Sequence, residues 1–486
     1  MVLVTILALP LLGGAVIAVG RGRRASAWVA VATNGATLVL GILTAVRVVK
    51  DGPISGAWGV LRADALSVFM VIVIGAISLL ASWLGIRTMT REQELEKDSS
   101  VRSSHYGMLV QAFVGFMLLA VLAANVGVLW VAVEATTIVT VFLVGYRRTR
   151  GSLEASWKYI VICSVGIALA FLGTVFVYLA ALHAGGHSAQ ALDWTSLMAH
   201  AHRFNPSLMR FAFALIVLGY GTKVGLAPMH SWLPDAHSQA PAPVSALMSG
   251  VLLTVAFYAI LRFKAVTDVA LGPGFARTLL VVVALLSLAL AASLLITQRD
   301  YKRMLAYHSI EHMGLIALGA AAGIRLAIAA VLLHILGHGL AKSVLFLTSG
   351  EIMAAEGTSQ IDGVRTLLAR RPALGGVFGV GLVALLGLPP FSLFTSELVM
   401  VRAEFEVGLG WAAVLAMVAM VVIFIAVVGH ARHMLLGPPT SSHLPAPPPR
   451  WVATPLIGGL AVCGFIGVFA WPLSGLLEAA ARVVAS

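Results

Sequence analysis

Charged residues are scarce in this 486-residue sequence: 11% are Asp, Glu, Lys or Arg, and 60% are hydrophobic. A soluble domain ordinarily carries about 25% charged residues, so this composition excludes an ordinary soluble fold. Strand-length alternation of polar and apolar residues is also missing, which argues against a membrane β-barrel. Instead, apolar runs of roughly twenty residues, the length that spans a bilayer as a helix, recur along the whole chain. The sequence therefore predicts an all-α polytopic membrane protein.

Cysteine is nearly absent as well. Cys163 and Cys463 each stand alone in an apolar segment, so they supply neither a disulfide framework nor a zinc or iron–sulfur ligand set. We therefore expect no cofactor and no cluster, and a chain that carries no electrons itself. The net charge of +12 is spread over many short loops. That distribution is typical of a membrane protein and argues against nucleic acid as a partner.

About fourteen membrane helices are predicted, with no soluble domain between them. They centre on Val2–Gly20, Ala27–Val46, Val68–Ile86, Met108–Ala124, Val126–Tyr146, Tyr159–Leu182, Leu208–Leu226, Val244–Phe263, Thr278–Thr297, Met304–Ala321, Leu326–Leu347, Ala373–Val401, Trp411–Val428 and Leu456–Leu477. A Pro-rich linker precedes the last of them. The first run has its positive charge behind it rather than ahead of it, so it is interpreted as a retained helix and not as a secretory signal.

The loops between the predicted helices differ in their content of Lys and Arg. Odd-numbered loops, which include residues 21–24, Arg147, Arg148, Arg370 and Arg371, carry more of these residues than even-numbered loops do. Positive residues concentrate in cytoplasmic loops. The bias therefore predicts that the odd loops lie in the cytoplasm and that both termini lie on the opposite side.

Four ionisable residues fall within or at the end of predicted spans: Glu134, Lys223, Lys342 and Glu397. A charge at membrane depth is expensive, and the default interpretation is functional. Lys342 also belongs to a row with His334 and His338 at positions i, i+4 and i+8, which places the three side chains on one helix face. Because histidine titrates near neutral pH, such a row can pass a proton. A polar stripe satisfied by neighbouring helices is the less favoured alternative.

Histidine spacing raises a metal alternative. His308, Glu311 and His312 match the pattern H-x-x-E-H of inverted zinc proteases. The pattern enters a membrane helix, and the sequence shows no obvious third ligand. His334 and His338 also have zinc-ligand spacing but lack an intervening Glu in the pattern H-E-x-x-H. Zinc-dependent hydrolysis is therefore disfavoured, and no metal is expected.

Two predicted spans are interrupted by proline next to a buried charge. Pro228 and Pro234 follow Lys223, while Pro389 and Pro390 precede Glu397. Proline interrupts a helix, and broken helices in the two halves of a transporter are a sequence pointer to inverted repeats around an ion site. His230, Asp235 and His237 lie just beyond the first break, where they suit either a proton entry or a subunit contact.

Three motifs resemble a known family. They are Lys223-Val-Gly-Leu-Ala-Pro-Met-His-Ser-Trp-Leu-Pro-Asp-Ala-His237, Asp300-Tyr-Lys-Arg-Met-Leu-Ala-Tyr-His-Ser309 and the run from His334 to Leu347. All three are similar to motifs of the proton-translocating, antiporter-like membrane subunits of respiratory complex I and its relatives. The resemblance covers the chain from about Met108 to Glu397.

The resemblance implies a domain organisation and residue roles. It implies three N-terminal helices in residues 1–105, a first five-helix repeat in 106–270, an inverted second repeat in 271–436, and the linker with helix 14 in 437–486. By motif, Glu134 resembles the carboxylate that pairs with the first lysine, Lys223 that lysine, Lys342 the central lysine with its two histidines, and Glu397 the terminal site.

Departures from the family pattern indicate which branch of the family this chain most resembles. Thr254 stands where many members have a lysine linking the two halves, and Glu311 with its flanking His308 and His312 is a candidate replacement. This combination most resembles the hydrogenase-4 component F branch, found in group 4 membrane-bound [NiFe] hydrogenases. The resemblance implies a bacterial inner membrane protein whose partners are other membrane subunits and a peripheral hydrogenase or oxidoreductase arm.

The sequence thus predicts a non-catalytic, ion-translocating subunit in which protons pass from Glu134 and Lys223 along the histidine row to Glu397. Three alternatives stay open. The chain could belong to a multisubunit Na⁺/H⁺ antiporter, to the membrane part of an inorganic-carbon uptake complex, or to a scaffold that anchors a hydrogenase without pumping. The four buried charges argue against the scaffold.

Overall fold

The computed structural model describes residues 1–20, 24–95, 99–185, 190–437 and 450–485. Within these ranges the chain is predominantly helical. Two features of the sequence, the arginine-rich segment at residues 21–23 and the Pro-rich segment at 438–449, lie outside the described residues.

Most of the elements are long helices. The first half of the chain contains α1 (Val2–Val19), α2 (Arg24–Asp51), β1 (Ile54–Gly56), β2 (Leu61–Ala63), α3 (Ala65–Leu95), α4 (Ser99–Leu122), α5 (Val126–Val144), α6 (Arg150–His183), α7 (Trp194–His200), α8 (Pro206–Val224), α9 (Trp232–Gln239), α10 (Ala242–Leu247) and α11 (Leu253–Leu271). The second half contains α12 (Pro273–Ile296), α13 (Tyr301–Ala322), α14 (Arg325–Glu356), α15 (Leu367–Arg370), α16 (Pro372–Leu385), α17 (Ser392–Glu406), α18 (Gly410–Leu436), α19 (Arg450–Val468) and α20 (Trp471–Val484).

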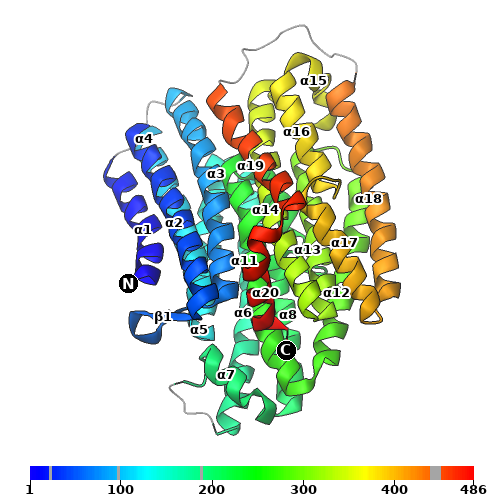
Figure 1. Cartoon of the computed structure of the whole chain (residues 1–486). Coiled ribbons are helices and arrows are strands. Elements are labelled where there is room, and N and C mark those ends of the chain that lie inside the picture. Colours follow the sequence, from blue (N-terminus) through cyan, green and yellow to red (C-terminus); the bar gives the residue numbers. More distant parts are fainter. Residues whose placement is uncertain (21–23, 96–98, 186–189, 438–449, 486) are drawn as a thin grey trace.

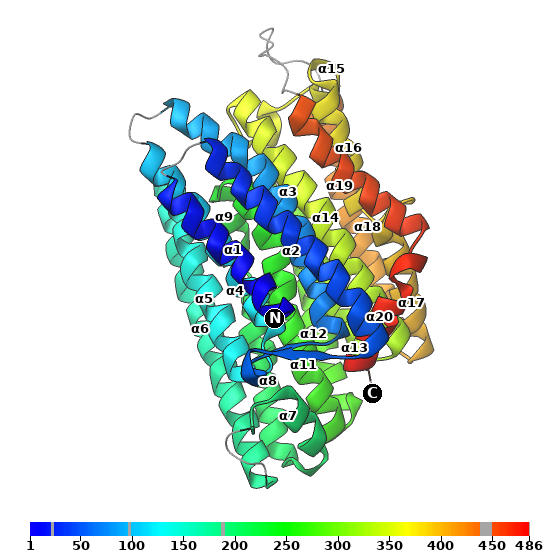
Figure 2. The same cartoon turned by 60° about the vertical axis from the view of Figure 1, so that its left-hand side comes forward.

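The long helices run side by side through one bundle (Figures 1 and 2). α11 and α14 lie inside it, and the most apolar stretch of each is wholly buried, whereas only 28% of that stretch is buried in α18 on the flank. The two central helices approach closely, because a side chain on Gly339 of α14 would lie only 2.9 Å from the carbonyl oxygen of Gly250, in the π-helical turn (Met248–Leu252) that precedes α11. Each predicted repeat therefore contributes one central helix.

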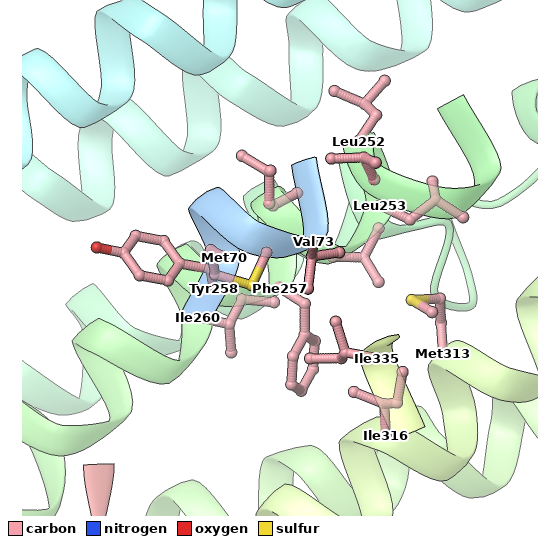
Figure 3. Close-up of a cluster of buried hydrophobic side chains, with 14 of the residues drawn as sticks. Met70, Val73, Leu252, Leu253, Phe257, Tyr258, Ile260, Met313, Ile316 and Ile335 are labelled. Atoms are coloured by element: carbon pink, nitrogen blue, oxygen red, sulfur yellow. The ribbon is translucent and has the colours of Figure 1, made fainter. Parts of the chain in front are cut away.

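Apolar side chains from both halves fill the centre of the bundle. Figure 3 shows this core, in which Met70 and Val73 of α3 lie near Phe257 of α11, and Ile316 of α13 lies beside Ile335 of α14. Most of the polar groups described below are therefore surrounded by closely packed apolar side chains.

Eleven described helices are long and apolar enough to cross a membrane, and the bent pair α19 and α20 brings the number to twelve. The protein is thus a multi-pass helical membrane protein, as predicted. α13 and the pair α16 and α17, which the sequence analysis also counted as spans, are not among the twelve. The count of fourteen and the inverted repeats remain predictions.

The helix predicted over Leu456–Leu477 consists of two helices joined at a bend. α19 ends at Val468, α20 begins at Trp471, and the two helices are bent by 77°. The physical reason is Pro472 in the first turn of α20, because proline cannot donate the backbone hydrogen bond that would continue α19.

A small hairpin also departs from the all-helical prediction. β1 pairs antiparallel with β2, with Ile54 opposite Ala63. Strands of three residues are too short to show an alternating pattern, so hydrophobic periodicity could not detect them.

Candidate functional site

Lys223 lies in the last turn of α8, where the first predicted break begins. The helix ends because Gly225 adopts a left-handed conformation at φ +83°, which favours glycine. The Lys223 side chain is fully buried, and its Nζ donates to Thr137 Oγ1 at 2.8 Å and to the Tyr159 hydroxyl at 2.5 Å. Two neutral hydroxyls from α5 and α6 therefore surround the ammonium group.

Glu134 lies on α5, one turn before Thr137, and is only half-buried. Its carboxylate interacts with the Thr137 hydroxyl and with the charge of Lys223. A direct ion pair within 4.0 Å does not form between Glu134 and Lys223 in the described part of the chain. Thr137 is therefore shared between the carboxylate and the ammonium group that the sequence analysis expected to pair.

The segment after the break places its polar residues in different surroundings. Pro228 is exposed and His230 half-buried, with the His230 ring against the Pro228 carbonyl. Asp235 forms ion pairs with Lys158 at 3.0 Å and Arg303 at 3.1 Å. Pro234 is buried inside α9. Among the described residues, neither His230 nor Asp235 contacts Lys223, and their proposed role in a proton entry or a subunit contact stays a prediction.

His237 is the member of this segment that points inward. It is fully buried, its Nδ1 lies 2.9 Å from the Leu233 carbonyl oxygen, and its ring lies between Trp232 and Phe346 of α14. Its charge interactions are with Lys342 and Lys302. Because Trp232 packs on Tyr159, His237 stands between the surroundings of Lys223 and those of Lys342.

Lys302 holds α9 in place. It lies at the start of α13, is buried, and its Nζ donates to the backbone carbonyls of Ser238 at 2.6 Å and Ala240 at 3.0 Å. Asp300 caps the same helix by accepting from the backbone N–H of Lys302 and Arg303. The Asp300-Tyr-Lys-Arg303 motif therefore begins α13 and attaches it to the broken helix.

The row His334, His338 and Lys342 is fully buried on α14 and faces α13. Lys342 Nζ donates to the Leu305 carbonyl oxygen of α13. Like Lys223, Lys342 has no carboxylate within ion-pair distance among the described residues, although it interacts electrostatically with Glu311.

Four histidines gather where α13 meets α14. The ring of His312 lies 4.9 Å from that of His308, 5.1 Å from that of His334 and 5.0 Å from that of His338. His312 Nδ1 is 2.9 Å from His334 Nε2, and His308 Nδ1 is 2.7 Å from Glu311 Oε2. Sequence spacing predicted two separate pairs of histidines, and tertiary packing joins them into one cluster.

Glu397 extends this cluster from α17. The chain leaves α16 at Leu385 and enters α17 at Ser392, with Pro389 and Pro390 between them. Gly387 in this break has φ +62°, and a side chain there would lie 2.1 Å from Glu397 Oε2. The break therefore passes directly over the carboxylate.

Two overlapping triads have ligand atoms within 4.8 Å of one another: His308, Glu311 and His312, and also His312, His334 and Glu397. The sequence analysis found no third ligand for the H-x-x-E-H pattern, and the structure places candidates from α14 and α17 beside it. In contrast, Thr254 is buried, and its hydroxyl donates a hydrogen bond to the nearby Val251 carbonyl. Among the described residues, this hydroxyl forms no hydrogen bond to the other half of the chain.

Sequence reasoning missed the neutral partners of the charged groups. Tyr159 and Thr137 bind Lys223, and the Ser396 hydroxyl lies 2.9 Å from His334 Nδ1. Glu404, buried near the end of α17, was also missed. Hydroxyl residues are common in membrane helices, so nothing in the sequence marks these ones. For Glu404, the signal was its spacing of seven residues from Glu397, two turns along the same face.

These contacts arrange titratable groups in an order that crosses the bundle. Glu134 and Lys223 stand at one side, His237 in the middle, and Lys342 with the histidine cluster and Glu397 at the other. Acidic and basic side chains in such an order can exchange protons by small changes of position or hydration.

Comparison with known proteins was consistent in family and fold. Residues 123–423 match the family described as NADH:quinone oxidoreductase/Mrp antiporter, TM. A hydrogenase-4 component F homolog of Methylacidiphilum infernorum is 40% identical over 342 residues, which cover 70% of this chain and 72% of the relative. Hydrogenase-4 component B of Escherichia coli is 30% identical over 352 residues, and there the match covers 69% of this chain but only 50% of the relative.

Solved structures show the same fold. A chain of the archaeal membrane-bound sulfane sulfur reductase superposes with a TM-score of 0.89 at 24% identity, covering 100% of this chain and 98% of the other. A chain of the Mrp complex from Dietzia sp. superposes with a TM-score of 0.86 at 21% identity, covering 100% and 97%.

Proposed function

This chain belongs to the NADH:quinone oxidoreductase/Mrp antiporter family of membrane subunits, and we propose that it is the proton-translocating membrane subunit of a multisubunit, redox-driven complex. The parent complex is a group 4 [NiFe] hydrogenase or a complex I-like oxidoreductase. In support, the relative with 40% identity bears the name hydrogenase-4 component F homolog. The subunit itself carries out no redox chemistry in this proposal.

One observation carries the proposal. Lys223 and Lys342 are fully buried ammonium groups, and among the described residues neither has a carboxylate within ion-pair distance. A buried charge without a direct counter-ion is maintained only by weaker partners. Small movements of those partners, Thr137 and Tyr159 for Lys223, therefore change how firmly the proton is held.

The proton route follows the order of the groups. Glu134 and Lys223 exchange the proton first, His237 relays charge changes toward Lys342, and the histidine cluster passes the proton to Glu397. Coupling between these sites is a free energy, so neighbouring subunits can drive the sequence without electrons entering this chain. Glu311 with its flanking histidines then takes the place of the lysine absent at position 254.

The finer architecture belongs to the same proposal. The chain crosses the membrane fourteen times, with α13 and the α16–α17 pair as spans in addition to the twelve found by length and apolarity. Residues 106–270 and 271–436 form the inverted repeats, in a bacterial inner membrane with both termini on the non-cytoplasmic side. In support, each half contains one broken helix beside a charged residue, at Lys223 and at Glu397.

The partners are other membrane subunits and a peripheral hydrogenase or oxidoreductase arm. In support, the solved relatives are chains of multisubunit membrane complexes. The half-buried Glu134 agrees with this, because lipid solvates a carboxylate poorly and a neighbouring subunit would shield it.

The proposal is tested by Lys223→Met in the intact complex, reconstituted into liposomes. Proton uptake is followed with a pH-sensitive dye while the redox reaction runs. We expect translocation to fall at least about 10-fold, because the carrier of the proton is gone, a change equivalent to about 1.4 kcal/mol. Lys50→Met, at the exposed end of α2, is the matched control and should pump normally. Wild-type pumping by Lys223→Met would refute the proposal.

A sodium/proton antiporter subunit is the second candidate, favoured by the match to a chain of the Mrp complex. The same liposomes decide between the two. Transport that requires Na⁺ and continues without a redox substrate would support the antiporter.

A further inference from the structure

We propose that His312, His334 and Glu397 form a binding site for a divalent transition-metal ion of the Zn²⁺ class, and that an ion bound there blocks the proton route. The three ligand atoms come from α13, α14 and α17 and lie within 4.8 Å of one another. The binding itself follows from these contacts alone, whereas the blocking effect rests on the proposed function.

The donor types select the class of metal. Imidazole nitrogen with one carboxylate oxygen suits Zn²⁺ and its transition-metal neighbours, whereas Ca²⁺ and Mg²⁺ prefer oxygen ligands throughout. Three protein ligands with a free fourth position form a common zinc arrangement. The triad therefore has both the composition and the number of donors that such an ion requires.

The distances fit with little movement. His312 Nδ1 and His334 Nε2 lie 2.9 Å apart. Bonds of about 2.0–2.1 Å in a tetrahedral site separate two ligand nitrogens by about 3.3 Å. For these two ligands, an entering ion therefore requires that the proton between them move to the other nitrogen of the ring that carries it, and that their separation grow by about 0.4 Å.

Ser396 orients the His334 ring, as hydrogen-bond partners commonly do for metal-binding histidines. Its hydroxyl lies 2.9 Å from His334 Nδ1 and fixes the ring so that Nε2 faces His312. A polar partner on the second nitrogen of a metal-binding histidine orients the ring and raises affinity.

An independent observation points to a missing ligand. His338 is fully buried, and neither of its ring nitrogens has a hydrogen-bond partner among the described residues, although its ring lies 5.0 Å from that of His312. His312 Nε2 is also buried without a partner. Buried polar atoms nearly always have partners, so these imidazole nitrogens point to an ion or water that would bind within the cluster.

The neighbouring triad is the weaker alternative. His308 Nδ1 already lies 2.7 Å from Glu311 Oε2, so a metal there would first break this contact. A metal bound by His312, His334 and Glu397 would break only the hydrogen bond between the His312 and His334 imidazoles.

The test measures bound metal in the intact complex, purified through a tag on this chain. The complex is washed with a chelator and equilibrated with Zn²⁺, and bound zinc is counted by mass spectrometry. We expect one zinc ion fewer per complex in His312→Gln than in the wild type. His105→Gln, an exposed histidine outside the cluster, should keep the wild-type number. Equal zinc content in the wild type and His312→Gln would overturn the proposal and leave water as the occupant.

Ser396→Ala provides a second variant that leaves every ligand in place. We expect its Zn²⁺ affinity to fall about 10-fold or more, in line with losses of orienting partners at known metal sites. The Zn²⁺ concentration that halves proton uptake should rise by the same factor. Unchanged affinity in Ser396→Ala would also overturn the proposal. Zinc binding without any wild-type pumping would instead refute the proposed function and leave the site intact.

Discussion

Lys223 is stabilised by hydroxyl groups. Its Nζ lies at the hydroxyl edge of the Tyr159 ring, 4.7 Å from the ring centre, and donates a hydrogen bond to the hydroxyl of that ring. A hydroxyl accepts a hydrogen bond from the charged lysine and donates one to the neutral lysine, so Tyr159 is compatible with both protonation states. A carboxylate in the same place would favour the charged state alone.

This dual role yields a prediction at the scale of one atom. Tyr159→Phe removes only the hydroxyl, and we expect proton translocation to fall roughly 10-fold, because a hydrogen bond to a charged group contributes about 1.5 kcal/mol. Proton uptake by reconstituted liposomes is the measurement.

The control for this change is Tyr220→Phe. Tyr220 is also buried on α8, but its hydroxyl has no hydrogen-bond partner in the described part of the structure. Its removal should leave pumping close to normal. Equal effects of the two substitutions would show that Tyr159 acts through packing and not through its hydroxyl.

At the scale of elements, the broken helix α8–α9 depends on α13. Where α9 ends before α10, its last backbone carbonyls lack the partners that a continuous helix would supply. Lys302 of α13 supplies these partners by donating to the carbonyls of Ser238 and Ala240. A residue of the second predicted repeat therefore stabilises the end of α9 in the first predicted repeat.

Lys302→Met should destabilise the protein, because it leaves at least one buried carbonyl unpaired at a cost of about 1–3 kcal/mol. Thermal unfolding of the purified complex, followed by the fluorescence of a fused reporter, measures the change. Arg303→Gln is the matched control. It breaks the partly exposed pair with Asp235, and such pairs contribute about 0–1 kcal/mol. A larger loss in Arg303→Gln than in Lys302→Met would contradict this account.

At the scale of the whole molecule, a buried ion pair attaches the N-terminal helices to the central helix α11. Asp64, at the start of α3, accepts from Arg262 of α11 at 2.6 Å through both carboxylate oxygens. Arg262 also donates to Ser67 and Tyr258. Residues 1–105, although outside the match to the family at 123–423, are therefore an integral part of the bundle.

The orientation of the whole chain is open to a labelling test. Thr149, just before α6, and Ser207, in the first turn of α8, are exposed. The predicted topology puts them on opposite sides of the membrane. The two native cysteines, Cys163 and Cys463, are buried. With cysteine at position 207, a membrane-impermeant maleimide should label intact spheroplasts, because the predicted even loops face outward. With cysteine at position 149, labelling should require inverted vesicles. The reverse pattern would place both termini in the cytoplasm.

How far the sequence could predict this site depends on the kind of residue. Glu134, Lys223, Lys342 and Glu397 were found because charge is rare and costly at membrane depth. Tyr159 could not be found, since an aromatic residue in a membrane helix is ordinary. The break in the last helix at Trp471 was missed because the apolar run continues through it, and hydropathy does not register a bend.

The sequence by itself determined the membrane setting, the positions of most helices, the buried charges and the two breaks next to Lys223 and Glu397. These follow from local properties: the length of apolar runs, helical spacing and the chemistry of proline. Only the tertiary structure decided which groups meet. His308 and His312 join His334 and His338 because α13 packs against α14, and Lys223 meets Tyr159 because α8 packs against α6. Contacts between helices depend on side-chain packing across the bundle, which spacing along one helix does not encode.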